Sequence, residues 1–258
     1  MLFLLSPAKT LDFESPLPPV TGSEPVFLGR SSALIDTLRK KTPKQIAALM
    51  DLSEGLAQLN VQRYQAWSPT VDRVNARPAL LAFNGDVYEG LDAKSLKPKE
   101  LAWAQGHIAI LSGLYGVLRP LDLMQPHRLE MQTALKHGKA NNLYQFWGQQ
   151  IAEHLNEQLV GDQDPLVVNL ASQAYFKAVD RKVLQARVIE CVFQDRKNGQ
   201  YKVISFFAKR ARGLMARYAV QKKAATIKAL QSFDWEGYAF DPSVSGNDTL
   251  VFRRHSNG

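Results

Sequence analysis

The sequence feature that most constrains the fold is an Asn-Gly pair, Asn198-Gly199, between the β-rich runs ARVIECVFQD and QYKVISFF. Asn-Gly in this setting is the strongest short-range signal of a β-hairpin, because both residues tolerate positive φ angles. Upstream of this pair, apolar runs with strand character alternate with helical patterns. Alternation predicts strands joined by helices, whereas the hairpin predicts an antiparallel pair. The sequence therefore predicts a mixed α/β (α+β) fold with flanking helices and a partly antiparallel mixed sheet.

Individual elements can be placed along the chain. Buried strands are expected within the segments MLFLLSPAKT, PALLAFNGDVYEGL, HIAILSGLYG, PLVVNLAS and TLVFRR. Helical patterns cover residues 31–63, residues 143–159 and the stretch after the hairpin, and a short helix is expected within GDVYEGL. The 258 residues contain no internal repeat, no low-complexity tract and no clear linker, so we expect a single domain spanning 1–258.

Positive charge is concentrated in one segment of the chain. The formal net charge is +8, yet no Asp or Glu occurs between Asp195 and Asp234, where ten Lys and Arg residues carry +10. The rest of the chain therefore carries only −2. Such local asymmetry indicates an anionic partner, which could be nucleic acid, an anionic membrane or a phosphorylated ligand.

The helix predicted after the hairpin, residues 207–223, separates apolar from basic side chains. At about 100° per residue, one face carries Phe207, Ala211, Leu214, Met215 and Tyr218. The other face, expected to be open to water, carries Lys209, Arg210, Arg212, Arg217 and Lys223. Like charges on one face repel each other, so we interpret this face as a contact for a phosphate backbone. A plain solvated face and lipid contact are the alternatives, and Gly213 predicts close packing against a helix or a partner.

A helix pair is predicted at residues 42–64, from Thr42 to Tyr64. Its core, LMDLSEGLAQL, resembles the helix-hairpin-helix motif, in which hairpin amides and a helix N-terminus face the phosphates of a duplex. Asp51 and Ser53 stand where that motif prefers glycine, although Ser53 can cap the second helix. An ordinary helical hairpin that packs its leucines is the alternative.

Polar loops follow three of the predicted strands: SPAKT, NGDVY and the Gly-x-x-Gly turn GLYG with the segment after it. Loops at the carboxyl ends of strands are where α/β proteins bind ligands. The candidate residues of this ligand loop region are Ser6, Lys9, Thr10, Asp86, Tyr115, Arg119 and Arg128. Simple turns, with Asp86 as a helix N-cap, are the alternative.

The sequence predicts no cofactor and no metal site. It contains no P-loop, dinucleotide fingerprint, nucleophile elbow or zinc-ligand spacing, and its five histidines are scattered. The single cysteine, Cys191, cannot form an internal disulfide and is expected to be a buried packing thiol. The apolar run MLFLL is too short for a signal peptide or a membrane span, so we expect a cytoplasmic protein without membrane contact. No protein partner is indicated.

Six segments together are similar to the peroxide stress protein YaaA family of bacteria. They are LLSPAKTLDF, FNGDVYEGL, LSGLYGVLRPLDLMQPHRLEM, LYQFWG, NLASQAYFKAV and ISFFAKRARGLMARY, and the resemblance extends from Met1 to about Arg253. It implies a cytosolic protein made under hydrogen peroxide stress, which limits damage to DNA and protein, in part by lowering free intracellular iron. It also implies a helix-hairpin-helix element and a positively charged cleft that binds double-stranded DNA.

The residues expected to contact DNA are Lys9, Thr10, Arg63, Lys177, Lys209, Arg210, Arg212 and Arg217. The resemblance places all of these except Arg63 at motif positions of the family, together with Ser6. Asn84 departs from a basic residue preferred before GDVY. We expect weak sequence preference, with bent or branched duplex as a candidate structure, and an indirect effect on iron.

Three alternatives stay open from the sequence. The first is an enzyme that acts on a nucleotide or nucleic acid with a site at the SPAKT, GDVY and GLYG loops, although a binding role is favoured over catalysis. The second is direct iron sequestration, against which the scattered histidines argue. The third is a protein of the membrane surface.

Overall fold

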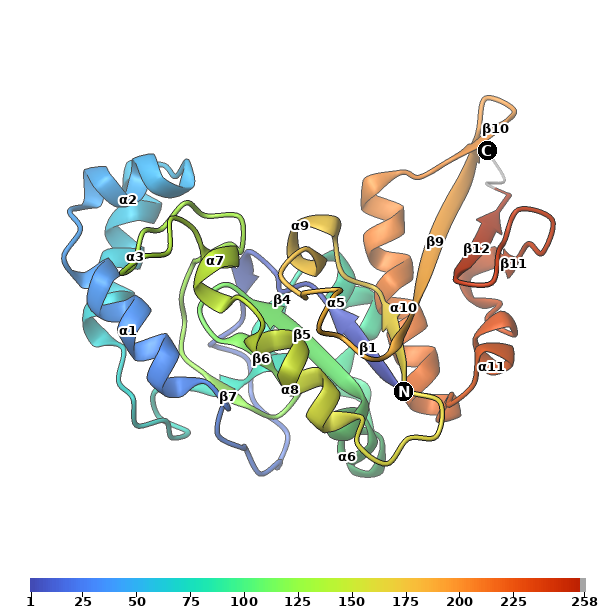
Figure 1. Cartoon of the computed structure of the whole chain (residues 1–258), viewed down its shortest axis with the longest axis horizontal. Helices are drawn as coiled ribbons and strands as arrows, with labels where there is room; N and C mark the ends of the chain where they lie inside the picture. The colour runs from blue at the N-terminus through green and yellow to red at the C-terminus, as the bar shows by residue number, and fades with distance from the viewer. Residues whose placement is uncertain (256–258) are drawn as a thin grey trace.

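The apolar run at the N-terminus forms β1 (Leu2–Leu5), an interior strand of a mixed sheet, and all four of its residues are buried. The computed structural model that shows this describes residues 1–255 (Figure 1). Strand β1 lies between β5 (Ile108–Ser112) and β8 (Leu166–Asn169) and is parallel to both. These strands are apolar except for Ser112 and Asn169 at the carboxyl ends of β5 and β8, as expected for strands whose two faces are covered by helices.

The strand order of the main sheet is β11-β12-β9-β8-β1-β5-β6, and β10 pairs with β9. Strands β12, β9, β8, β1 and β5 run parallel to one another, whereas β11, β10 and β6 pair antiparallel with β12, β9 and β5. The remaining strands of this sheet are β6 (Gly116–Leu118), β9 (Arg187–Lys197), β10 (Gln200–Lys202), β11 (Tyr238–Phe240) and β12 (Thr249–Arg254). The predicted mixed, partly antiparallel sheet is therefore confirmed.

The predicted hairpin at Asn198-Gly199 is also confirmed. Both residues have positive φ angles, 53° and 78°, and they join β9 to β10. Strand β9 is eleven residues long, and its far end carries the hairpin away from the rest of the sheet (Figure 1). The segment after β10 then leads into α10 (Ser205–Lys222).

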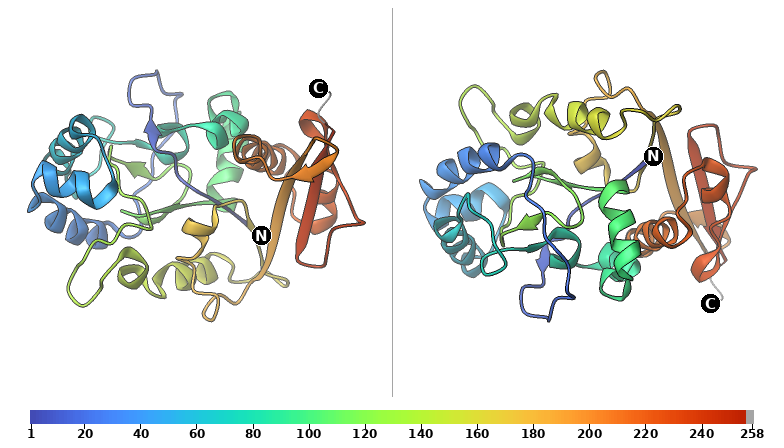
Figure 2. Two further views of the ribbon diagram at one scale, coloured as in Figure 1. Left: turned by 90° about the horizontal axis from the view of Figure 1, so that it is seen from above. Right: turned by 90° about the horizontal axis from the view of Figure 1, so that it is seen from below.

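Helices lie on both sides of the central strands. Figure 2 shows α6 (Pro98–His107) and α8 (Gln150–Gln158) on opposite sides of β1 and β5. One end of the molecule is built from α1 (Leu28–Arg39), α2 (Pro43–Met50) and α3 (Glu54–Ala66). The shorter helices are α4 (Ala79–Ala82), α5 (Asp86–Leu91), η1 (Ala93–Ser95), α7 (Leu143–Trp147), α9 (Gln173–Phe176), α11 (Ile227–Gln231) and η2 (Trp235–Gly237).

Two secondary-structure predictions are wrong in detail. The apolar stretch after Pro78 forms the single helical turn α4 instead of a strand, because its first amides, those of Ala79 and Leu80, donate to carbonyls of the 120–122 segment. Only β4 (Phe83–Asn84) is extended there, and it pairs with β2 (Thr10–Leu11). The predicted helix over 143–159 is broken into α7 and α8 at Gly148, whose φ of 52° cannot continue a right-handed helix.

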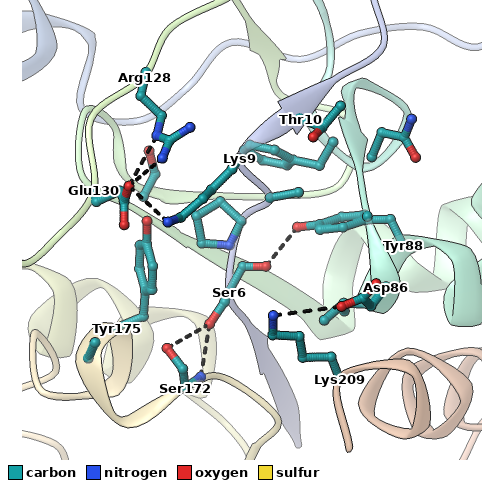
Figure 3. A pocket seen from close by; sticks show the side chains of 18 of the residues that line it. Ser6, Lys9, Thr10, Asp86, Tyr88, Arg128, Glu130, Ser172, Tyr175 and Lys209 are labelled. Carbon is teal, nitrogen blue, oxygen red and sulfur yellow. Dashed lines mark hydrogen bonds and ion pairs between the residues drawn. The ribbon is translucent and has the colours of Figure 1, made fainter. Parts of the chain in front are cut away.

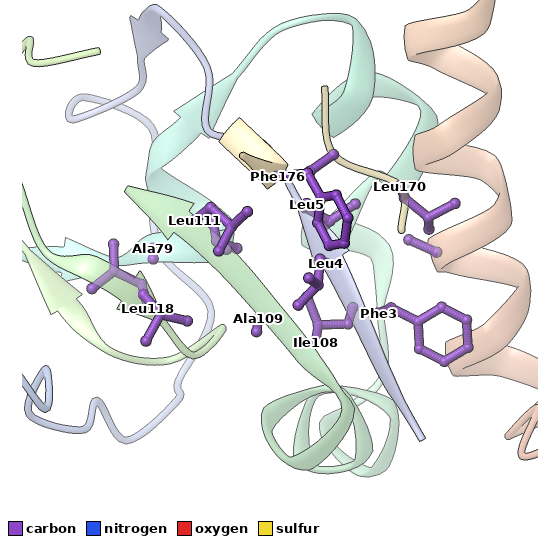
Figure 4. Close-up of a cluster of buried hydrophobic side chains, with 14 of the residues drawn as sticks. Phe3, Leu4, Leu5, Ala79, Ile108, Ala109, Leu111, Leu118, Leu170 and Phe176 are labelled. Carbon is purple, nitrogen blue, oxygen red and sulfur yellow. The ribbon is translucent and has the colours of Figure 1, made fainter. Parts of the chain in front are cut away.

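The hydrophobic core is centred on β1 and β5. Side chains of β1 and β5 pack with those of the 170–176 segment and with Leu118 (Figure 4). The two-residue strand β3 (Arg77–Pro78) pairs with β7 (Leu123–Met124), which connects the chain before α4 to the segment after β6. Within residues 1–255, no helix is both long enough and apolar enough to cross a membrane.

Candidate functional site

A cavity of about 450 Å³ lies at the carboxyl edge of the central strands (Figure 3). Its walls come from the loops after β1 and β8, the start of α5, the 127–132 segment and the first half of α10. Of the residues predicted from the sequence, seven line this cavity. They are Ser6, Lys9, Thr10, Asp86, Arg128, Lys209 and Arg212.

The loops after β1 and β8 meet because the two strands are parallel neighbours whose carboxyl ends share one edge. The amide of Ser172 donates to Oγ of Ser6 at 2.8 Å, and the two hydroxyl oxygens are 3.3 Å apart. The Tyr88 hydroxyl donates to the Ser6 carbonyl at 3.0 Å. Ser6 is thus fixed from two directions at the floor of the cavity, and Ser172 is a site residue that the sequence did not indicate.

Glu130 forms ion pairs with two cations, Lys9 and Arg128, on one side of the cavity. Arg128 donates to its Oε1 from Nη2 at 2.7 Å and from Nε at 3.1 Å, and Lys9 Nζ lies 3.5 Å from the same oxygen. Glu130 was missed in the sequence, although the spacing in His127-Arg128-Leu129-Glu130 offers a signal. Alternate residues of an extended segment point the same way, so Arg128 and Glu130 share a side.

Asp86 and Lys209 form the opposite side of the cavity, with Oδ2 and Nζ 3.6 Å apart. The prediction that Asp86 is an N-cap is wrong by one residue, since Gly85 holds that position and Asp86 begins α5. Gly85 has a φ of 150°, a conformation available essentially to glycine alone, and it lies against Ala8. This contact brings the start of α5 beside the loop after β1.

Close packing of α5 on α10 sets the position of the basic side chains. A Cβ at Gly213 would come within 1.8 Å of the Val87 carbonyl oxygen, and one at Gly90 within 2.2 Å of the Arg210 carbonyl oxygen. The close helix packing predicted for Gly213 is therefore confirmed. The two glycines let the helix backbones touch, which aims Lys209 and Arg212 at the cavity.

The expectation of a water-exposed cationic face on α10 is wrong for its arginines. Arg210 is held by both oxygens of Glu236, at 2.6–3.1 Å. Arg217 donates to the Leu91 and Asp92 carbonyls at 2.8 Å, and its side chain is only 18% exposed. The helix is enclosed on several sides because α5 covers the face that the sequence pattern assigned to solvent.

Arg212 is the exception among these arginines. It is partly buried and lines the cavity. Within residues 1–255, no hydrogen-bond acceptor contacts its guanidinium, although the charge of Glu190 on β9 lies near. Burial lowers the pKa of Arg212 from its ordinary value, and the nearby charge of Glu190 opposes this effect.

Tyr115 and Arg119 lie outside the cavity and serve the fold. Tyr115 is fully buried, and its hydroxyl oxygen accepts from Trp67 Nε1 at 3.0 Å and from the Gln125 amide at 3.1 Å. Burial raises the pKa of Tyr115 to about 12. Arg119 donates to the buried carboxylate of Asp122 at 2.9 Å. The GLYG segment is thus a packed turn, with its glycines against other parts of the core.

Lys177 and Arg63 also lie outside the cavity. Lys177 Nζ sits 5.0 Å from the ring centre of Tyr144, beside a separate concavity of about 670 Å³. Arg63 is partly buried, and burial lowers its pKa. Its charge acts on His127, a cavity residue whose pKa falls to about 4, chiefly through burial. His127 is therefore neutral at pH 7, and its Nδ1 donates to the Gln125 carbonyl at 2.8 Å.

The predicted helix pair at 42–64 is present as α2 and α3. Asp51 has a φ of 51°, the left-handed conformation that favours glycine, which gives a physical reason for the glycine preferred at such hairpins. Ser53 caps α3 as predicted, accepting from the Leu56 amide at 3.4 Å. The helical hairpin is confirmed, whereas its contact with a duplex stays a prediction.

Two further residue predictions concern thiols and metals. Cys191 is buried as expected, and burial raises the pKa of its thiol to about 12. In the part of the chain that the structure describes, no three His, Cys, Asp or Glu side chains form a group that could hold a metal ion.

Comparison with known proteins places the whole chain in one family. The family described as peroxide stress protein YaaA matches residues 1–244. A UPF0246 protein of Paracidovorax citrulli is 62% identical, with 100% of both chains covered. UPF0246 proteins of Albidiferax ferrireducens and Bordetella petrii are each 63% identical, covering 98% of this chain and 98% and 99% of their own. The chain therefore belongs to the peroxide stress protein YaaA family, a family of oxidative stress proteins.

Proposed function

We propose that this protein acts under peroxide stress by binding double-stranded DNA on the surface around the mouth of the cavity. The observation that carries the proposal is a set of exposed lysines on the β9–β10 hairpin and the start of α10: Lys197, Lys202 and Lys209, of which Lys209 lines the cavity. Within residues 1–255, the side chains of Lys197 and Lys202 have no ion-pair or hydrogen-bond partner, and Lys209 has only Asp86 at 3.6 Å. Exposed cations with at most one such protein partner can neutralise phosphates and release counterions.

Exposed apolar side chains that stand between Lys202 and Lys209 in the sequence support contact with nucleic acid. Phe206 is 55% exposed and lies one helical turn before Lys209, so the two share a side of α10. Val203, just after β10, is 53% exposed. Apolar side chains between cations suit the mixed surface of a nucleic acid, which offers bases as well as phosphates.

The helical hairpin of α2 and α3 offers a second contact. Lys40 and Lys44 flank the start of α2, are exposed, and have no side-chain partner in the described part of the chain. Figure 1 shows this hairpin and the β9–β10 hairpin at opposite ends of the molecule, with α9 between them. Because α9 contributes to the cavity wall, a duplex that contacts both ends would pass close to the cavity.

A salt titration of a fluorescent 20-base-pair duplex tests this proposal. The wild type is compared with Lys197→Gln/Lys202→Gln/Lys209→Gln and with a control of equal charge change, Lys222→Gln/Lys223→Gln/Lys228→Gln. The control lysines are exposed: Lys222 and Lys223 lie at the far end of α10, and Lys228 lies in α11. We expect the affinity of the first variant for the duplex to be at least about tenfold lower. The slope of log K against log salt concentration should be about two to three smaller in magnitude.

The control variant should lose less than about threefold in affinity, because it alters only the long-range field. Equal losses in both variants, or no binding by the wild type at about 50 mM salt, would contradict the proposal.

Side chains that reach phosphates carry no direct sequence information. We therefore propose weak sequence preference, and the same titration with a bent or branched duplex measures any preference for shape. The lowering of free iron stays a prediction from the family resemblance.

A further inference from the structure

The cavity has a chemical character that binding to a duplex backbone does not require. Its lining includes four cationic side chains against two carboxylates, Asp86 and Glu130, so it carries a net charge of +2 with His127 neutral. Its volume of about 450 Å³ is that of a small-molecule site. An open phosphate-contacting surface needs no such enclosed space.

The positive charge inside the cavity is only partly used by the protein. Lys9 and Arg128 share Glu130, and Lys209 faces Asp86 at 3.6 Å, so these cations have partners. Arg212 differs, since no acceptor within residues 1–255 contacts its guanidinium. A partly buried guanidinium without an acceptor is costly, whereas its forked donors match a phosphate group. Arg212 follows Lys209 by three positions, so both side chains address the same part of the cavity.

Aromatic side chains form another part of the wall. Tyr88 and Tyr175 lie on opposite sides of Ser6 (Figure 3), and Phe83 also lines the space. The Tyr88 hydroxyl is already used by the Ser6 carbonyl, which leaves its ring as the contact surface. Burial raises the pKa of both tyrosines, so they are neutral at pH 7 and do not repel an anion. Rings of this kind provide stacking or edge contacts for a planar base.

We propose that the cavity binds a single nucleotide, with the phosphate held between Arg212 and Lys209 and the base against the tyrosine-lined wall. This nucleotide could be free in solution or extruded from a DNA strand that lies over the cavity mouth. The extruded form rests on the DNA binding proposed above, whereas the free form does not. Extrusion would place an unpaired base in an enclosed pocket.

Calorimetric titration of the full chain tests the site with three probes: deoxyadenosine monophosphate, deoxyadenosine and inorganic phosphate. We expect the nucleotide to bind at least tenfold more tightly than either of its parts. Arg212→Gln should weaken nucleotide binding at least tenfold, whereas Arg210→Gln should change it less than twofold. Arg210 is the matched control because it lies on the same helix, outside the cavity, paired with Glu236.

Circular dichroism confirms that each variant is folded, and Arg212→Lys provides a second test. The lysine keeps the charge but lacks the fork, so we expect an affinity between those of the wild type and Arg212→Gln. Equal binding of nucleotide and inorganic phosphate would overturn recognition of the base. Unchanged binding in Arg212→Gln would overturn the site itself.

A second set of titrations distinguishes the two sources of the nucleotide. A fully paired duplex is compared with the same duplex carrying one unpaired deoxyadenosine, with free nucleotide as competitor. An extruded nucleotide is supported if the duplex with the unpaired deoxyadenosine binds more tightly than the paired duplex. This preference should disappear in Arg212→Gln and when free nucleotide is added as competitor. Nucleotide binding without that preference supports the free form, including the case in which no duplex binds. No nucleotide binding and no preference for the unpaired base would overturn the inference, even if the paired duplex binds.

Discussion

Arg212 and Arg217 lie five residues apart on α10, and the fold uses their charges in opposite ways. Arg217 donates to the Leu91 and Asp92 carbonyls at 2.8 Å and to Ser95 Oγ at 2.7 Å. Arg212 lines the cavity, and no acceptor within residues 1–255 contacts it. Arg217 therefore joins α10 to α5 and η1, whereas the guanidinium of Arg212 has no acceptor within residues 1–255.

The difference arises from what α5 brings to each side chain. The carboxyl end of α5 presents carbonyls to Arg217, while its amino end opens on the cavity that Arg212 and Lys209 line. A charge count along the sequence gives both arginines the same weight, although within residues 1–255 only Arg217 is held by hydrogen bonds to the protein. The density of basic residues therefore predicts a long-range field, and the local packing decides which charges make contacts.

The largest effect should come from breaking the seam between α5 and α10, by which we mean the contact centred on Gly90 and Gly213. Gly213→Ala would place a Cβ 1.8 Å from the Val87 carbonyl oxygen, so the helices must separate. We expect a loss of about 3 kcal/mol in the free energy of unfolding. Urea denaturation at pH 7 measures it.

Gly106→Ala is the matched control for this substitution. Gly106 lies in α6, where the added Cβ would meet no neighbouring side chain or loop within 4 Å. We expect a gain of about 0.5–1 kcal/mol in the free energy of unfolding, from reduced entropy of the unfolded chain. A similar loss in both variants would mean that the seam has no special role.

The cavity side of the comparison can be tested through pH. The pKa of His127 is about 4 in the folded protein, below its ordinary value of 6.5, because the imidazole is buried. Between these two values the unfolded chain binds more protons, so the stability contributed by this group is lost as pH falls from 6.5 to 4. We expect that loss to be on the order of 3 kcal/mol.

Urea denaturation from pH 7 to pH 4 compares the wild type with His127→Gln. Groups that both proteins share, including Asp12 with its lowered pKa, cancel in the difference. The wild type should lose more stability over this range than the variant. Parallel curves would show that His127 is not held neutral by the cavity wall.

Local signals in the sequence predict the parts of the fold that depend on neighbours in the chain. Asn198-Gly199 predicts the hairpin, and the apolar run at the N-terminus predicts β1. The break at Gly148 was missed, because a glycine within a helical pattern is tolerated as often as it ends a helix. The end of a helix at a glycine depends on the backbone φ and ψ angles that the glycine adopts, and the residue type alone does not determine these angles.

The site was predictable only in its individual loops. Ser6, Lys9, Asp86, Lys209 and Arg212 were candidates on separate segments, but no sequence pattern brings them to one cavity. Contacts such as Ser6 with Ser172 join residues 166 positions apart, and they depend on the order of the strands. The sequence therefore indicates side chains with suitable chemistry, but it does not indicate which of them form hydrogen bonds and ion pairs within the protein.

The smallest expected effects compare the two arginines directly. Arg217→Gln should lower the free energy of unfolding by about 2 kcal/mol, because it leaves partly buried acceptors without their charged donor. Arg212→Gln should change it by less than about 0.5 kcal/mol or raise it, because it removes a partly buried charge that has no acceptor. Thermal or urea unfolding of the two variants at pH 7 gives both values, and equal losses would erase the distinction between them. If the two stabilities differ as expected, the two variants should show the opposite order in nucleotide binding. Arg217→Gln should leave nucleotide affinity unchanged, because the Arg217 side chain is hydrogen-bonded within the protein. Of the two variants, only Arg212→Gln should weaken nucleotide binding.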